Sequence, residues 1–161
     1  MKKLFLIRHA KSSWKKHQLN DFDRPLNKRG FQNAPFMGKI LASKNITVDT
    51  ILSSPALRAK TTAQLIAKEL GITDIVYKDL IYEASVENLL HLIKQCNNKD
   101  NTVVLIGHNP SLNLLASYWV DFNDNIPTCG ILEFECNTHK WENISKNNVK
   151  FVSFEYPKKN N

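Results

Sequence analysis

The chain contains 161 residues, which is enough for one well-packed domain and too few for two ordinary ones. Its hydrophobic content of 42% is normal for a globular protein, and no apolar run is long enough to cross a membrane. We therefore expect a single domain over residues 1–157 without a membrane partner, followed by a frayed end at residues 158–161.

The net charge of +7 comes largely from lysines that are spread along the chain. A basic surface raises encounter rates with phosphates or acidic proteins. No aromatic platform or recognition-helix signature accompanies these lysines, so nucleic acid is not an expected partner. The cysteines, Cys96, Cys129 and Cys136, lack metal-ligand spacing and cannot all pair with one another, which indicates reduced thiols in the cytoplasm.

Strand-like and helix-like patterns alternate along the chain, which predicts an α/β domain. Short apolar runs that are typical of strands lie at residues 3–7, 50–52, 75–77, 102–107, 131–134 and 151–154. Apolar residues repeat at helical spacing over residues 27–43, 55–71, 86–96 and 109–119. We expect a three-layer α/β/α sandwich around a mostly parallel central sheet, with the last two strands antiparallel to each other.

Local signals predict several boundaries. The first apolar run resembles the start of a secretory signal, but Arg8 ends it after four residues, which favours a strand. Pro35 lies inside the first helical pattern, so we expect a kink or a restart there. Ser54 and Pro55 suit the N-cap and first residue of the second helix, and Gly71 suits its C-terminal stop.

Three of the strand-like runs lead to a histidine or an arginine beyond their carboxyl ends. Arg8 and His9 leave the first run, Arg58 lies shortly after the second, and His108 follows the run that ends at Gly107. In open α/β sheets this edge is where ligands bind. Two arginines and two histidines at one edge predict an anion site and favour phosphoryl transfer.

These motifs resemble the histidine phosphatase superfamily, whose fold is phosphoglycerate mutase-like. The segments that carry the resemblance are Arg8-His9-Ala10, Ser53-Ser54-Pro55 with Arg58, and Gly107-His108. The short, single-domain SixA-type branch of phosphohistidine phosphatases is similar in further segments, at residues 21–27, 29–30, 82–84 and 107–110. The resemblance runs from Met1 to about Trp119. It implies a nucleophile at His9, with Arg8, Arg58 and His108 around the phosphate.

The chemistry of these residue types agrees with that assignment. A neutral imidazole is a good nucleophile toward phosphorus, and water then cleaves the phosphohistidine that forms. Neighbouring arginines disfavour a positive charge on His9, so we expect it to be neutral in the empty site. Arg8 and Arg58 can each hold phosphoryl oxygens through paired N–H groups. His108 can neutralise a third oxygen, either as a cation or as a neutral N–H donor.

Other residues near these motifs have less specific roles. Glu83 follows the third strand-like run and could protonate a leaving alkoxide, as an acidic residue from this region does in much of the superfamily. It could equally cap a helix or form an ion pair. Ser13, together with Ser12 and Trp14, is expected at the mouth of the pocket as a substrate contact, and Lys11 could steer phosphate toward it.

Two features near the nucleophile have structural interpretations. Asp21 and Asp23 are expected mainly to shape the loop before Pro25, although either could orient an arginine. The superfamily usually has glycine where this chain has Ala10, and we expect the added methyl group to narrow the approach to His9.

The sequence therefore predicts a phosphatase that uses neither metal nor cofactor and forms a phosphohistidine intermediate on His9. We expect its substrate to be phosphohistidine on a protein, because so short a chain leaves little room for a lid. The alternatives are a phosphomonoesterase on a small metabolite, for which Glu83 becomes essential, and a non-enzymatic domain that reads phosphate. A mutase is disfavoured because it needs an enclosed site. A metal site is disfavoured because the arginines would repel a dication.

Overall fold

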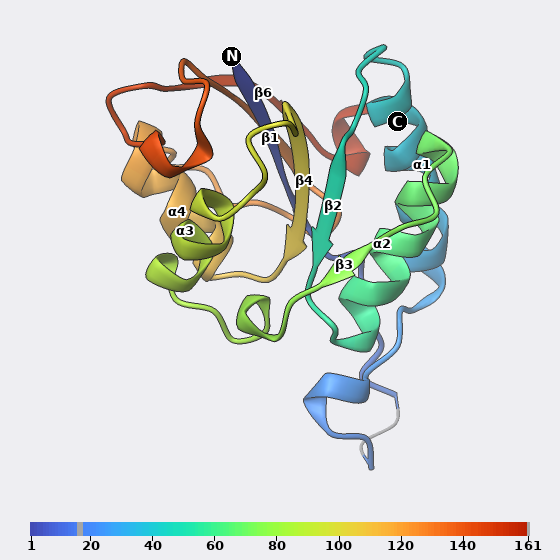
Figure 1. The fold of residues 1–161 in the computed structure, drawn as a ribbon. Coiled ribbons are helices and arrows are strands. Elements are labelled where there is room, and N and C mark those ends of the chain that lie inside the picture. The colour runs from blue at the N-terminus through green and yellow to red at the C-terminus, as the bar shows by residue number, and fades with distance from the viewer. Residues whose placement is uncertain (16–17, 161) are drawn as a thin grey trace.

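A six-stranded sheet forms the middle layer of the computed structural model, which describes residues 1–15 and 18–160 (Figure 1). The strands are β1 (Lys2–Arg8), β2 (Thr50–Ser53), β3 (Val76–Tyr77), β4 (Thr102–Gly107), β5 (Ile131–Cys136) and β6 (Val149–Glu155). Their order across the sheet is β3-β2-β4-β1-β5-β6. Strands β1 to β4 pair in parallel, whereas β5 is antiparallel to both of its neighbours, β1 and β6. The predicted mostly parallel sheet is confirmed.

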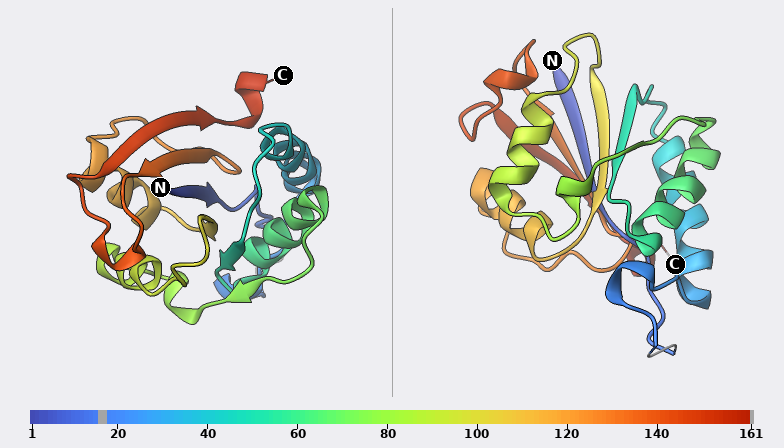
Figure 2. Two further views of the ribbon diagram at one scale, coloured as in Figure 1. Left: turned by 45° about the horizontal axis from the view of Figure 1, so that its top comes forward. Right: turned by 60° about the horizontal axis from the view of Figure 1, so that its bottom comes forward.

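Helices cover both faces of this sheet, which confirms the predicted sandwich (Figure 2). One face carries α1 (Lys28–Ala42) and α2 (Leu57–Leu70), and the other carries α3 (Val86–Lys94) and α4 (Ser111–Val120). Because side chains alternate along a strand, β1 contributes to both apolar cores. Phe5 is buried in the core beneath α1 and α2, whereas Leu4 is buried in the core beneath α3 and α4.

The carboxyl ends of β1, β2 and β4 lie together because these strands are parallel neighbours. The loop that follows β1, coloured blue, projects beyond this edge of the sheet (Figure 1). It contains the short 3-10 helix η1 (Asp21–Asp23). A single antiparallel bridge between Ser12 and Leu26 ties its two arms together. This loop and the strand ends form the walls of the candidate site.

Two predicted boundaries of the helices differ in the structure. Helix α1 continues through Pro35, so the restart that we allowed for is wrong, whereas the alternative of a kink stays a prediction. Pro35 has no N–H for the Phe31 carbonyl four residues earlier, and the helix tolerates the loss of this hydrogen bond. Helix α2 begins at Leu57 rather than at Pro55, and the Ser54 hydroxyl contacts His108 and the Ala56 N–H instead of capping the helix. The predicted stop at Gly71 is confirmed by its left-handed conformation, with φ of 71°.

The C-terminal segment that we expected to fray forms a short 3-10 helix, η4 (Pro157–Asn160). Lys159 ties it to β6, because its Nζ donates to the Phe154 carbonyl at 2.8 Å. Asn161 lies outside the described residues. Within residues 1–15 and 18–160, no helix combines the length and the apolar character that a membrane span requires. The three cysteines are free thiols, and the cytoplasmic location expected from them stays a prediction.

Candidate active site

The end of β1 delivers Arg8 and His9 to a pocket at the carboxyl edge of the sheet. The main chain is held here from two sides. The His9 N–H donates to the Gly107 carbonyl at the end of β4, at 3.0 Å, and the Cys129 N–H donates to the carbonyls of Arg8 and His9, each at 3.0 Å. The backbone of the predicted nucleophile is therefore fixed by the end of β4 and by the segment just before β5, rather than by the loop that follows.

A buried hydroxyl links this strand end to the first turn of α2. Thr62 Oγ1 accepts the Ala10 N–H at 2.9 Å and donates to the Arg58 carbonyl at 2.7 Å. One buried oxygen atom thus joins the backbone next to His9 to the backbone of Arg58. Ala10 itself is fully buried in the core beneath α1 and α2 and does not line the pocket, so its methyl group does not narrow the approach to His9.

The pocket has a volume of about 220 Å³ and is smaller than grooves elsewhere on the molecule. The pocket differs from those grooves in its charge, because the described residues of its lining include arginine and lysine side chains but no aspartate or glutamate. The lining consists of Arg8, His9, Lys11, Ser12, Trp14, Arg24, Arg58, His108, Asn109 and Thr128. Such a set is suited to an anion.

His9 is held in the protonation state that a nucleophile needs. Its Nδ1 lies 2.8 Å from the Ala10 carbonyl oxygen. Because a carbonyl can only accept, Nδ1 carries the proton and Nε2 keeps its lone pair. Burial lowers the pKa of His9 to about 4, and the charges of Arg58 and Arg8 act in the same direction. At neutral pH the imidazole is therefore uncharged.

His108 lies beside His9, with 5.1 Å between the ring centroids. Its Nε2 is 2.8 Å from Ser54 Oγ, which also accepts the Ala56 N–H at 3.2 Å. The hydroxyl proton of Ser54 finds no other acceptor among the described residues, so we assign it to His108 Nε2. His108 then carries its proton on Nδ1, which is buried and has no partner in the described part of the chain.

The same burial makes His108 a neutral donor rather than a cation. Burial, together with the neighbouring His9 and Arg58, lowers the pKa of His108 to about 3. Of the two roles that the sequence leaves open for this residue, the empty site fits the neutral N–H donor.

The two predicted arginines point guanidinium groups toward the pocket with donors to spare. Arg8 Nη1 donates to the Ile126 carbonyl at 2.8 Å, and Arg58 Nη1 and Nη2 donate to the carbonyl and carboxylate of Asp21 at 2.6 and 2.9 Å. The Nε atoms of both arginines are buried, and neither has a partner among the described residues. A buried donor without a partner is costly, so these groups are poised for a ligand oxygen.

Asp21 does more than shape its loop. Besides Arg58, its carboxylate accepts from Arg24 Nε at 3.2 Å and from the Tyr82 hydroxyl at 2.8 Å. Although burial acts to raise it, the pKa of Asp21 is lowered by these hydrogen bonds and by the arginine charges. The role that we judged secondary for Asp21, that of orienting an arginine, is the one that its contacts support.

Arg24 is a site residue that the sequence analysis did not select. It is buried, lines the pocket and stacks on Trp14, with 3.4 Å between the guanidinium carbon and the ring centroid. Its Nη1 is a further buried donor without a partner in the described structure. The only available signal was its place in the SixA-like segment, because no periodic pattern surrounds it. Asn109 and Thr128 were likewise not singled out as lining residues.

The structure does not bring every predicted residue into the pocket. Lys11, Ser12 and Trp14 line it, but Ser13 does not, and its Oγ accepts the Lys15 N–H at 3.2 Å. Glu83 is exposed, lies outside the lining and has a left-handed backbone, with φ of 54°. It forms no ion pair with any described residue, and the N-terminus of α3 is capped by Ser85 instead.

The donor set does not form a metal site. No three histidine, cysteine, aspartate or glutamate side chains of the described residues converge in a way that could hold an ion. The two histidines of the pocket are surrounded by arginines instead.

The comparisons with known proteins agree with this geometry. The sequence matches the profile of the histidine phosphatase superfamily (branch 1) over residues 4–95. A structure from Agrobacterium tumefaciens assigned as phosphohistidine phosphatase SixA is 29% identical, covers 97% of this chain and 98% of its own, and gives a TM-score of 0.83. The protein histidine phosphatase SixA in complex with tungstate is 19% identical, with coverage of 94% and 95% and a TM-score of 0.81.

Another structure with the same fold, but with a lower TM-score, belongs to a phosphatase that is named for a different substrate. Phosphoserine phosphatase of Entamoeba histolytica, in complex with phosphoserine, is 19% identical, with coverage of 96% for both chains and a TM-score of 0.69. At this identity the last two structures support the fold alone.

Proposed function

The chain belongs to the histidine phosphatase superfamily, and we propose that it is a phosphatase that removes phosphate from phosphohistidine on a protein. One observation carries the choice of substrate: no aspartate or glutamate is present among the described residues that line the pocket. An alkyl phosphate leaves as an alkoxide and needs a proton from an acid. An imidazole can leave as a neutral ring without one, so a pocket without an acid fits a phosphorus–nitrogen bond. The SixA structure that is 29% identical supports the same class.

The first step transfers the phosphoryl group to His9. The Nε2 lone pair attacks phosphorus while the P–N bond to the substrate imidazole breaks, and that ring leaves neutral because its second nitrogen carries a proton. Arg8 and Arg58 hold the phosphoryl oxygens through Nε and the remaining guanidinium protons, and His108 Nδ1–H donates to a third oxygen. These donors are fixed before the reaction, so they stabilise developing charge without reorganising.

The second step returns the enzyme to its starting state. Water attacks the phosphorus of phosphorylated His9, the bond from phosphorus to Nε2 breaks, and inorganic phosphate leaves. The hydrogen bond from Nδ1–H to the Ala10 carbonyl persists throughout, so the ring keeps its orientation for both transfers.

The test is steady-state turnover of a protein phosphorylated on histidine, measured beside a panel of sugar and glycolytic phosphomonoesters with a chelator present. We expect a clear preference for the phosphohistidine protein and no effect of the chelator. Acid-labile, base-stable phosphate bound to the protein during turnover would identify the intermediate. A preference for a phosphomonoester would keep the His9 chemistry, overturn the substrate and make Glu83→Gln the next variant.

A further inference from the structure

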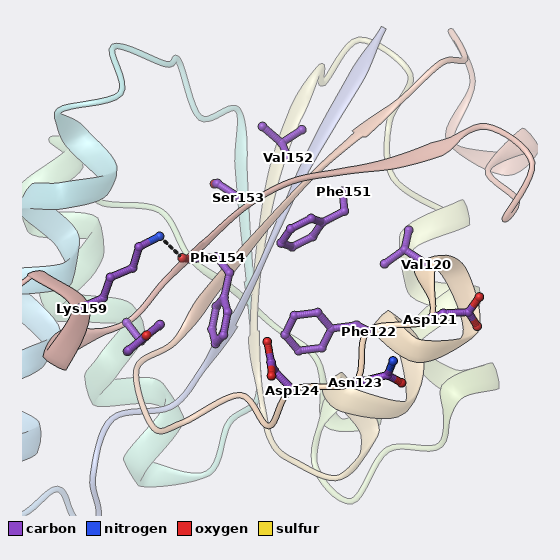
Figure 3. Close-up of a pocket in the computed structure, with 11 residues that line it drawn as sticks. Val120, Asp121, Phe122, Asn123, Asp124, Phe151, Val152, Ser153, Phe154 and Lys159 are labelled. Carbon is purple, nitrogen blue, oxygen red and sulfur yellow. Dashed lines mark hydrogen bonds between the residues drawn. The ribbon is translucent and has the colours of Figure 1, made fainter.

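An aromatic groove of about 700 Å³ lies beside β6 (Figure 3), and it shares no described lining residue directly with the catalytic pocket. β6 is the last strand of the sheet and pairs only with β5. The rings of Phe151 and Phe154 pack around Phe122, with centroid distances of 5.9 and 5.3 Å. Phe151 is 38% exposed and the neighbouring Val152 is 40% exposed, so apolar surface remains open to a partner.

Shared lining residues connect this aromatic groove to the catalytic pocket. Tyr156, which directly follows β6, lines the aromatic groove and two smaller hollows of about 300 and 260 Å³. Thr128 lines both the second of these hollows and the catalytic pocket. The catalytic pocket, the second hollow and the aromatic groove therefore lie next to one another along the surface. The outer part of this surface alone, from Phe151 to Tyr156 along an extended chain, is roughly 16 Å long, longer than a small phosphate ester can occupy.

The charge along this surface changes sign. Near the catalytic pocket, Arg29 and Lys158 line the second hollow and add to the positive charge of the site. In the lining of the aromatic groove, Asp121 and Asp124 are exposed, whereas the ammonium group of its lysine, Lys159, lies 3.6 Å from Glu155 Oε1. Neither aspartate forms a salt bridge with another described residue, although the chain has a net charge of +7. A complementary partner therefore carries negative charge at one end and positive charge with apolar side chains at the other.

We propose that the aromatic groove is a docking surface for the polypeptide that carries the phosphoryl group, and that it binds a segment in which apolar residues alternate with lysine or arginine. This inference rests on the proposed function, since it places the phosphorylated residue in the catalytic pocket. The bound segment runs from that pocket past Thr128 and Tyr156 to Phe122 and Phe151. Recognition of the protein is thereby separated from recognition of its phosphate.

The test uses synthetic phosphohistidine peptides whose distal residues are either apolar and basic or polar and acidic, with phosphoramidate as the small substrate. The intact enzyme should turn over the apolar-basic peptide with a kcat/KM at least tenfold higher, through a lower KM. Tyr156→Ala should remove most of this preference, because buried aromatic side chains dominate binding at such surfaces. Asp124→Lys should weaken it several-fold. Neither variant should change turnover of phosphoramidate.

Matched controls separate docking from folding and from general charge. Tyr118→Ala removes an equally large aromatic side chain that is 55% exposed on α4, and Asp74→Lys reverses an exposed charge before β3; both should leave the preference intact. Equal turnover of the two peptides by the intact enzyme, or a preference that survives Tyr156→Ala, would overturn the inference. If no phosphohistidine substrate is turned over at all, the proposed function fails. Fluorescence anisotropy of the unphosphorylated peptides then still decides whether the aromatic groove binds.

Discussion

The catalytic pocket and the aromatic groove are two open depressions that are built in opposite ways. His9 is 7% exposed and is held by hydrogen bonds from several elements, whereas Phe151 is 38% exposed and contacts mainly other rings. The pocket leaves buried N–H donors without partners, and the aromatic groove leaves apolar area and two carboxylates. The first arrangement suits a charge whose position must be fixed, and the second suits side chains whose position can vary. The following experiments test whether chemistry and recognition are separate.

The largest expected effect is that of His9→Ala. Loss of a nucleophile lowers turnover by about 10⁴–10⁶ in comparable enzymes. The backbone bonds of residue 9 do not involve its side chain, so the variant should fold and should still bind the apolar-basic peptide. Turnover and peptide anisotropy measured on the same sample check both statements. Near-normal turnover would contradict the nucleophile assignment.

Arg58→Ala should lower kcat by about 10²–10³, the usual loss for a preorganised donor that faces developing charge. Arg58→Lys should restore little, because an ammonium group carries its donors on one nitrogen and lacks the planar fork with which the guanidinium reaches Asp21 and the phosphoryl oxygens at the same time. Single-turnover kinetics with phosphoramidate would measure this without any contribution from docking. Full recovery in the lysine variant would mean that only the charge at this position matters.

Ser54→Ala should have a smaller effect, about a tenfold loss of kcat, since Ser54 acts through His108 rather than on the substrate. The diagnostic readout is the tautomer of His108, followed by ¹⁵N chemical shifts of the imidazole. We expect the proton to stay on Nδ1 in the parent protein and in Ser54→Thr, and to redistribute in Ser54→Ala. An unchanged tautomer in Ser54→Ala would leave Ser54 with a packing role only.

The smallest expected effect is the change of the melting temperature with pH. The pKa values of His9 and His108 are lowered by burial to about 4 and 3, from an ordinary value of 6.5. Below pH 6.5 the unfolded chain therefore binds more protons than the folded one, so stability falls as the pH drops from 6.5 toward 4. The melting temperature should decrease by several degrees over this window, and His108→Asn should reduce the decrease. A melting temperature that is equally pH-dependent in that variant would contradict burial of a neutral His108.

The strand ends could be predicted because their signals are local. An apolar run that stops at a charged residue marks both the strand and the residue that leaves it, and this located Arg8, His9 and His108 at one edge. The order of strands in the sheet brings Arg58 to them, and the alternation of elements already predicted such a layered sheet. The fold and the ring of predicted phosphate contacts therefore required no information beyond periodicity and motif resemblance.

The other residues of the site are brought together by contacts within and between loops, and such contacts produce no periodic pattern in the sequence. Arg24 enters the pocket because it stacks on Trp14 and pairs with Asp21, all within a loop whose sequence predicts only turns. Ser54 looked like a helix cap because serine suits that role, but its hydroxyl is bound to His108, and the helix begins later. Ser13 was expected at the pocket together with Ser12 and Trp14, but it does not line that pocket, and the bridge between Ser12 and Leu26 that holds this arm is not visible in the sequence.

The hydroxyl of Thr62 has a practical consequence for engineering. It ties the main chain next to His9 to the main chain of Arg58 from inside the core, so this link stays in place when exposed loop residues are changed. An exchange within residues 11–27 or 121–128 must still keep Asp21 and the carbonyl of residue 126, because their oxygen atoms hold Arg58 and Arg8. Thr62→Val, which keeps the shape and removes both hydrogen bonds, would show how much of the catalytic geometry one buried oxygen atom provides.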